Sequence, residues 1–307
     1  MKKKKILILG GGISKEREIS LETAKQVNNA LKKKYLTLFS EPNDSLIKNV
    51  KKFKPNIIFN ALHGRFGEDG YIQSVLEGLK IKYTHSGILS SSIAMDKIIS
   101  KEIFIKNKIL TPKYLKFNFS NDILKKNKIT NKIKLKLKFP VVIKPINEGS
   151  SVDVFICFEK NLIKNLKKLE KYKEILIEEY IGGREIQVAI LGKKKLGAIE
   201  LKPKRKFYDY TAKYNSKAKT KHLIPVSLSL KNMNKILNIA FKVHNLLRCR
   251  GVTRSDFKFY NNKFYLLEIN TQPGMTKLSL VPEIAAYKGM NFLNLLEWIL
   301  NDASINK

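Results

Sequence analysis

The sequence has little of what marks several classes of protein. Its 307 residues include two cysteines, Cys157 and Cys249, and no CxxC pair. Neither a disulfide framework nor a zinc site is therefore expected, and a reducing compartment fits. No run approaches the roughly 18 apolar residues of a membrane span, and the apolar run behind the lysine-rich start, residues 6–9, is too short for a signal peptide. We expect a soluble, cytoplasmic protein with no membrane partner.

Acidic residues are also scarce. The chain has 26 Asp and Glu against 60 Lys and Arg, a net charge of +34. Such an excess suggests a nucleic-acid or anionic-membrane partner. The lysines, however, are scattered in short runs along the whole chain, and no interleaved basic and aromatic pattern marks a surface on which bases stack. We interpret the charge as a solvated basic surface, with a nucleic-acid surface as the alternative.

Two nucleotide-binding signatures are absent. The phosphate-binding pattern GxxxxGK[ST] does not occur. Residues 10–12 are three glycines, but they do not fit GxGxxG because Lys15 stands where the last glycine belongs. These absences disfavour a P-loop NTPase and a dinucleotide-binding Rossmann domain.

What the chain does have is alternating strand and helix patterns. In the first third, strands at 5–9 and 57–60 alternate with helices at about 19–31 and 71–79, which is typical of an α/β, doubly wound parallel sheet. Further along we expect a helix at 95–107, strands at 139–144, 154–158, 175–180, 185–191 and 195–201, and helices at 231–247 and 283–300. Residues 118–138 are predicted to be an exposed, variable segment, and residues 202–222 a long functional loop.

The sharpest pattern is a hairpin formed by residues 252–260 and 263–270, which turns at two asparagines. Strand alternation puts Arg254 and Asp256 on one face of the first strand. On the second strand it separates Glu268 and Asn270 from Tyr265, Leu267 and Ile269. If the polar sets align, two carboxylates and an amide oxygen converge, which suits Mg²⁺. The alternative is a hairpin whose polar side faces water.

Three segments lie at the ends of predicted strands. Residues 148–151, Glu-Gly-Ser-Ser, follow the strand that ends at Lys144, and small residues let backbone N–H groups approach an anion; an ordinary polar turn is the alternative. Residues 10–16 and 63–70 lie beyond carboxyl ends of strands, where open α/β sheets bind ligands. His63 is either structural or a ligand contact.

Taken together, these segments resemble the D-alanine–D-alanine ligase family of the ATP-grasp superfamily, collinearly across nearly the whole chain. The stretches that carry the resemblance are GGGISKEREISL (10–21), ALHGRFGEDG (61–70), YTHSG (83–87), SIAMDK (92–97), FPVVIKP (139–145), EGSSV (148–152), FYDYTAKY (207–214) and LLEINTQPGMTKLSLVP (266–282). The resemblance implies an α/β (α+β) ATP-grasp fold of three domains. These are an N-terminal substrate-binding domain at 1–95, a central ATP-grasp domain at 96–182, and a C-terminal catalytic domain with a lid loop at 183–307.

The resemblance also implies roles for residues at matching positions. For ATP, the co-substrate, these are Lys97 and Lys144 at the phosphates, Glu148 and Ser151 in the loop over them, Glu178, Tyr180 and Ile181 at adenine, Glu185 at the ribose, and Lys213 in the lid. Two Mg²⁺ or Mn²⁺ ions are implied at Asp256, Glu268 and Asn270. The first D-alanine is implied at Glu16 and His63, and the second at Ser279 and Leu280. Arg254 and Gly274 are implied as oxyanion donors, and Ser150 and Tyr214 as substrate contacts.

The implied reaction joins two D-alanines through an acyl phosphate, for peptidoglycan precursors, in a homodimer. Three alternatives stay open: a D-alanyl-D-lactate or D-alanyl-D-serine ligase, another ATP-grasp carboxylate–amine ligase, and a degenerate, non-catalytic basic protein that binds nucleic acid. In the family a tyrosine at the position of Tyr214 goes with amine acceptors. The chain departs from the family pattern at Asp153, where glycine is usual, at Gln272, where a smaller residue is usual, and at residues 220–223.

Overall fold

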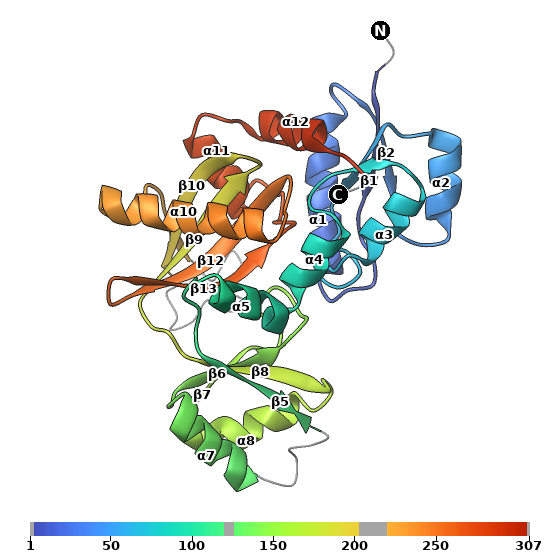
Figure 1. The fold of residues 1–307 in the computed structure, drawn as a ribbon. Helices are drawn as coiled ribbons and strands as arrows, with labels where there is room; N and C mark the ends of the chain where they lie inside the picture. Colours follow the sequence, from blue (N-terminus) through green and yellow to red (C-terminus); the bar gives the residue numbers. More distant parts are fainter. Residues whose placement is uncertain (1–2, 120–125, 203–219, 306–307) are drawn as a thin grey trace.

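The computed structural model describes residues 3–119, 126–202 and 220–305. Three sheets with their helices form three lobes (Figure 1). We call them the N-terminal part (residues 3–95), the central part (residues 111–182) and the C-terminal part (residues 183–305). The helix α5 (Lys97–Lys106) connects the first two.

The N-terminal part is a parallel sheet with helices around it. Its elements are β1 (Lys5–Leu9), α1 (Arg17–Leu31), β2 (Leu36–Ser40), α2 (Ser45–Phe53), β3 (Ile57–Asn60), α3 (Tyr71–Gly78), β4 (Lys82–Tyr83) and α4 (Ile88–Met95). The strand order is β2-β1-β3-β4, and all pairs are parallel. β1 and β3 read as continuous buried runs because helices cover both faces of such a sheet. The predicted doubly wound parallel sheet is confirmed.

The central part is an antiparallel sheet backed by two helices. Its elements are β5 (Tyr114–Asn118), α7 (Lys126–Lys136), β6 (Val141–Pro145), β7 (Phe155–Cys157), α8 (Glu159–Lys168) and β8 (Glu174–Glu179), in the order β5-β8-β6-β7. The prediction of an exposed, variable segment at 118–138 was wrong for α7. Ile129, Ile133 and Leu137 are buried at helical spacing, a stripe that the surrounding lysines and asparagines concealed.

The C-terminal part is an antiparallel sheet with helices on both faces. Its elements are β9 (Arg184–Leu191), β10 (Lys194–Lys202), β11 (Lys221–Leu223), α10 (Leu230–Leu246), β12 (Val252–Tyr260), β13 (Lys263–Asn270), α11 (Leu280–Tyr287) and α12 (Phe292–Asp302), in the order β11-β10-β9-β12-β13. The predicted helix at 283–300 is two helices, because the chain turns at Gly289 with a φ of +80°. The loop predicted at 202–222 lies mostly outside the described residues, and β11 occupies its end.

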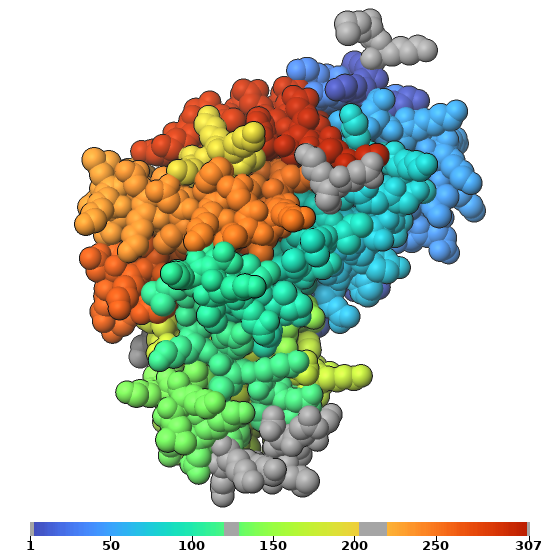
Figure 2. All heavy atoms as spheres, in the orientation of Figure 1, coloured from blue at the N-terminus to red at the C-terminus, as the bar shows by residue number. Residues whose placement is uncertain are grey.

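The lobes are joined unequally. One hydrophobic cluster contains β1, β3 and α1 together with β10, α11 and α12, so the N- and C-terminal parts share a core. The central part has its own cluster, drawn from residues 117–177, and Figure 2 shows it projecting from the rest of the molecule. α5, although assigned by sequence to the central domain, packs its Phe104 into a C-terminal cluster. The three domain boundaries themselves stay a prediction.

The end of the chain returns to its beginning. α12 packs on α1 (Figure 1), and Ser304 forms a bridge with Tyr83 at the edge strand β4. Among the helices in the described part of the chain, none combines the length and the apolar character needed to cross a membrane.

Candidate active site

Two cavities meet where the three parts come together. The larger, of about 510 Å³, is lined by residues of the N-terminal part, by the loop 148–150 and by the C-terminal sheet. The smaller, of about 80 Å³, lies between the central and C-terminal sheets. Lys97, Glu148 and Glu268 line both. Every predicted site residue that the structure describes lines one of these cavities, whereas Lys213 and Tyr214 lie outside the described residues.

The hairpin β12–β13 brings its polar residues together as the strand alternation predicts. Arg254 pairs across the strands with Asn270, and Asp256 with Glu268. Beyond this point the register shifts, so that Leu267 is an extra residue in a β-bulge. The prediction that Leu267 shares a face with Ile269 was therefore wrong. Leu267 lines the smaller cavity, and its neighbour Leu266 enters the core instead.

The donor set at this hairpin fits a magnesium or manganese ion. Two carboxylates and an amide oxygen on adjacent strands are the hard oxygen ligands that these ions prefer. Among the described residues there is no group of three His, Cys, Asp or Glu arranged for a metal. Arg254 holds the Asp256 carboxylate with two hydrogen bonds of 2.7 and 3.0 Å. Its guanidinium thus balances part of the negative charge that gathers here.

Lys97 lies at the start of α5 and reaches the junction of the cavities. The Asp96 carboxylate caps this helix by accepting from the Ile98 and Ile99 N–H groups. Lys97 Nζ donates to the Glu148 carbonyl at 2.6 Å and lies 3.7 Å from the Glu268 carboxylate. The cap therefore fixes the buried Lys97 ammonium group between the loop 148–151 and the hairpin.

Lys144 belongs to a chain of three buried charges. The Glu178 carboxylate lies 2.5 Å from Lys144 Nζ and 2.9 Å from Lys101 Nζ. Burial alone would raise the pKa of the Glu178 carboxyl, but the two ammonium groups hold that pKa below its usual value. Burial lowers the pKa of Lys101 despite its anionic neighbour. Sequence reasoning missed Lys101, although it lies one helical turn after Lys97 and so on the same face of α5.

The rest of the smaller cavity is apolar at one end and ionic at the other. Tyr180, Ile181 and Ser151 line it, and the Glu185 carboxylate forms an ion pair with Lys258 Nζ at a distance of 2.8 Å. Lys258 was also missed. Strand alternation could have found it, because it shares a face with Arg254 and Asp256.

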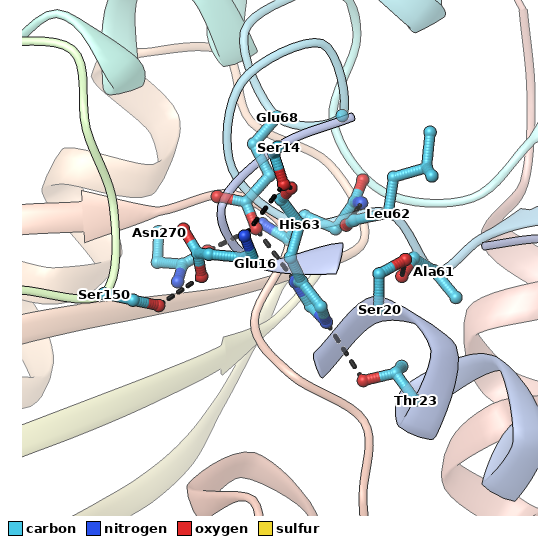
Figure 3. A network of polar contacts seen from close by, with 12 residues as sticks. Ser14, Glu16, Ser20, Thr23, Ala61, Leu62, His63, Glu68, Ser150 and Asn270 are labelled. Atoms are coloured by element: carbon cyan, nitrogen blue, oxygen red, sulfur yellow. Dashed lines mark hydrogen bonds and ion pairs between the residues drawn. The ribbon is translucent and has the colours of Figure 1, made fainter. Parts of the chain in front are cut away.

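Glu16 connects the N-terminal part to the loop 148–151 of the central part. It lies between β1 and α1, is 6% exposed, and its carboxylate accepts a short hydrogen bond from the Ser150 hydroxyl. Figure 3 shows the Glu16 side chain directed toward Ser150, with Asn270 beside it. Both predicted substrate contacts thus face the larger cavity.

His63 is held on both sides of its ring. Nδ1 lies 3.0 Å from the Glu68 carboxylate, and Nε2 lies 3.0 Å from the Thr23 hydroxyl of α1 (Figure 3). A carboxylate at Nδ1 fixes the tautomer with its proton on that nitrogen. The buried ring then presents one edge to the larger cavity.

The start of α11 faces the same cavity from the opposite side. Ser279 occupies the position before the first helical residue, Leu280, and its hydroxyl lies 2.8 Å from Thr276 Oγ1. The unpaired N–H groups and the dipole at a helix start favour a carboxylate. Gly274 lines the cavity between this helix start and the hairpin.

Comparisons with known proteins agree with this geometry. The family described as "D-ala D-ala ligase C-terminus" matches residues 103–301. The chain is 69% identical to a D-alanine--D-alanine ligase of Pelagibacter ubique (strain HTCC1062), with 99% of each chain covered. It is 42% identical to the D-alanine--D-alanine ligase of Wolbachia pipientis wMel, over 98% of this chain and 95% of the relative.

Solved structures have the same fold. The D-alanine--D-Alanine Ligase of Bacillus anthracis complexed with ATP matches with a TM-score of 0.83 and 32% identity, covering 98% of this chain and 97% of the other. The ligase structure from Coxiella burnetii, at 24% identity and a TM-score of 0.82, matches in fold over 98% of this chain and 94% of the other.

Proposed function

The chain belongs to the D-alanine–D-alanine ligase family, and from this premise we propose which of its residues carry each step. It is an ATP-dependent enzyme that ligates two D-alanine molecules, a step in making peptidoglycan precursors. The observation that best supports the assignment is the junction of the two cavities. A nucleotide in the smaller cavity would present its terminal phosphate beside Lys97, Glu148 and Glu268, which also line the larger one.

In the first step, a carboxylate oxygen of one D-alanine attacks the terminal phosphorus of ATP, the bond from this phosphorus to the bridging oxygen breaks, ADP leaves, and an acyl phosphate forms. Lys97 and Lys144 neutralise phosphate charge from opposite sides of the loop 148–151, and transfer of a phosphoryl group depends mainly on such positioning and charge. Glu16 binds the ammonium group of this D-alanine, and His63 lies near its carboxylate. Tyr180, Ile181 and Glu178 surround the adenine, and Glu185 binds the ribose.

Asp256, Glu268 and Asn270 would hold Mg²⁺ or Mn²⁺ at the junction. When bound, such ions would act as Lewis acids and neutralise the negative charge that develops during phosphoryl transfer. The chain's own contribution is to keep the three oxygen donors together on paired strands.

In the second step, the neutral amine of the other D-alanine attacks the acyl carbon, phosphate leaves from the tetrahedral intermediate, and the nitrogen loses a proton to give the amide. Ser279 and Leu280 bind its carboxylate at the start of α11. Arg254 and the Gly274 N–H stabilise the oxyanion, and removing one such donor typically costs on the order of 10²–10³ in rate. Lys213 and Tyr214, which lie outside the described residues, remain the predicted lid, whose purpose would be to exclude water that hydrolyses the acyl phosphate.

Phosphate release tests this assignment directly. The enzyme is mixed with ATP, Mg²⁺ and either D-alanine, L-alanine, or D-alanine with D-lactate, and the products are weighed by mass spectrometry. We expect release with D-alanine and a product of the dipeptide mass. Release only with D-lactate present would assign the chain to the depsipeptide ligases instead. A folded, ATP-binding protein that releases no phosphate would contradict the catalytic assignment.

We also propose a homodimer in the cytoplasm. Light scattering of the purified protein checks the first, and a mass of one chain would contradict it. Fractionation of cells checks the second.

A further inference from the structure

A cluster of charges joins the N-terminal and central parts beside the phosphate loop. Lys15, from the segment between β1 and α1, approaches three groups of the central part. Its Nζ lies 2.7 Å from the Tyr172 hydroxyl and 3.5 Å from the carboxylates of Glu148 and Asp153. It also lies over the Tyr172 ring, 5.2 Å from the centroid. A single lysine of one lobe therefore contacts both ends of a loop in another.

Asp153 is the anchor of this cluster in the central part. Its carboxylate accepts a 2.6 Å hydrogen bond from the Tyr172 hydroxyl and forms an ion pair with Lys171 Nζ at 2.7 Å. Partial burial opposes its ionisation, but Lys171, Tyr172 and Lys15 hold the pKa of Asp153 below its usual value. A glycine, usual in the family at this position, would make none of these contacts.

The loop needs contacts of this kind because its backbone is strained. Ser150, Ser151 and Asp153 have φ values of +50°, +59° and +55°. Left-handed backbone is unfavourable for a non-glycine residue, least for Asp and Asn, and it persists where the surroundings impose it. Lys15 and its neighbour Glu16, which accepts from Ser150, are both contacts from the N-terminal part.

We propose that Lys15, Tyr172 and Asp153 are positioning residues that fasten the loop 148–153 to the N-terminal part and so favour ATP binding. The hydrogen bonds run in one direction, from the Lys15 ammonium to the Tyr172 oxygen and from the Tyr172 hydroxyl to Asp153, so each strengthens the next. The inference rests on the proposed function only in assigning this loop to the phosphates of ATP.

A double-mutant cycle tests the proposal. Lys15→Met keeps the aliphatic stem and removes the charge, while Asp153→Asn keeps a residue that tolerates left-handed backbone. We expect either change to raise the KM for ATP about 3- to 10-fold, in the range of exposed to partly buried charged pairs, with kcat at saturation changed less than about twofold. Because both act through one contact chain, the double variant should resemble the singles.

Lys171→Met is the matched control. It removes a cation that lies closer to Asp153 than Lys15 does, at 2.7 Å against 3.5 Å, but Lys171 belongs to the central part, so no contact between lobes is lost. We expect its KM for ATP to stay within about twofold of the wild type. An equal rise in Lys171→Met would show that the charge of the cluster matters rather than the connection between lobes, and would overturn the proposal.

Two further results would also overturn it. Multiplied effects in the double variant would mean that Lys15 contacts ATP directly, and a fall in kcat alone would mean a role in the chemistry. Calorimetric titration with Mg²⁺ and a non-hydrolysable ATP analogue measures the same weakening without turnover. The proposal therefore stays testable even if D-alanine proves not to be the substrate, and unchanged circular dichroism shows that each variant is folded.

Discussion

The N-terminal part has two interfaces with the rest of the chain, which we call seams, and they differ in burial and in polar contacts. Its seam with the C-terminal part is mostly buried and consists mainly of amide and hydroxyl contacts, with an exposed ion pair between Lys34 and Glu297. Gln272 donates from its side-chain nitrogen to the Leu62 carbonyl and accepts from Asn60 at 2.8 Å, and Ser90 donates to the Arg248 carbonyl at 2.8 Å. A shared hydrophobic core lies behind these contacts.

Its seam with the central part is more exposed and ionic. Lys15 is half exposed and Asp153 is 24% exposed, and the central part keeps a separate core. Charged contacts near water are worth little each and are screened by salt. The difference teaches that the N- and C-terminal parts form one body, whereas the central part is held to the N-terminal part by contacts that can be made and broken at low cost.

Breaking the buried seam should have the largest effect. Gln272→Ala leaves two buried partners in need of hydrogen bonds, and each costs about 1–3 kcal/mol. We expect thermal unfolding at a Tm lower by about 5–10 °C, measured by differential scanning calorimetry. Lys15→Met, at the other seam, should lower Tm by less than about 2 °C. Equal losses in the two variants would remove the distinction between the seams.

Mild acid should weaken the buried seam next. His85 lies there against the C-terminal part, where a Cβ at Gly251 would come within 3.1 Å of its Cα. Burial first, then His63 and Arg250, lower the pKa of His85 to about 3. The unfolded chain takes up a proton near pH 6.5 and the folded chain does not, so stability falls as the pH falls through 6.5.

The size of this effect follows from the gap between the two pKa values. From pH 7 to pH 5 the free energy of unfolding should drop by about 2 kcal/mol for His85, measured by urea denaturation. The ionic seam should not respond, because Asp153 stays charged at pH 5. A rise in stability on acidification would contradict the neutral, buried state of His85, and an NMR titration of its ring checks that state directly.

Salt should weaken the ionic seam and leave the buried seam unchanged, and this effect should be the smallest of the three. Raising KCl from 50 to 500 mM shortens the screening length to about 4 Å, so the KM for ATP of the wild type should approach that of Lys15→Met. We expect the ratio of the two to shrink about two- to threefold, while Tm changes little. A ratio that is constant with salt would mean that Lys15 acts through shape and not through charge.

Much of this molecule can be predicted from its sequence, for identifiable reasons. β1, β3 and the hairpin were predicted with their observed bounds, because continuous apolar runs and strict alternation with an asparagine turn are strong local signals. α7 was missed because its three core residues stand among lysines. The break between α11 and α12 was missed because both helices are apolar, and the four residues between them, 288–291, contain a single glycine.

The candidate site also has a part that could be predicted from local sequence and a part that could not. The hairpin residues could be placed together because one turn fixes their register. The contacts of Lys15 with Asp153 and of Gln272 with Leu62 could not, because each joins segments more than 130 residues apart. The sequence marked Asp153 and Gln272 only as departures from a family pattern, and each departure carries a contact between lobes.

The bridge between Ser304 and Tyr83 has a consequence for synthesis on the ribosome. The first-made sheet gains its last neighbour, and the shared core its residues from α12, only when almost the whole chain has left the exit tunnel. Contacts of such sequence separation form slowly. During synthesis, the apolar surface of the N-terminal part that later packs against α12 therefore stays exposed. The central part has a core of its own and can complete its folding while translation continues.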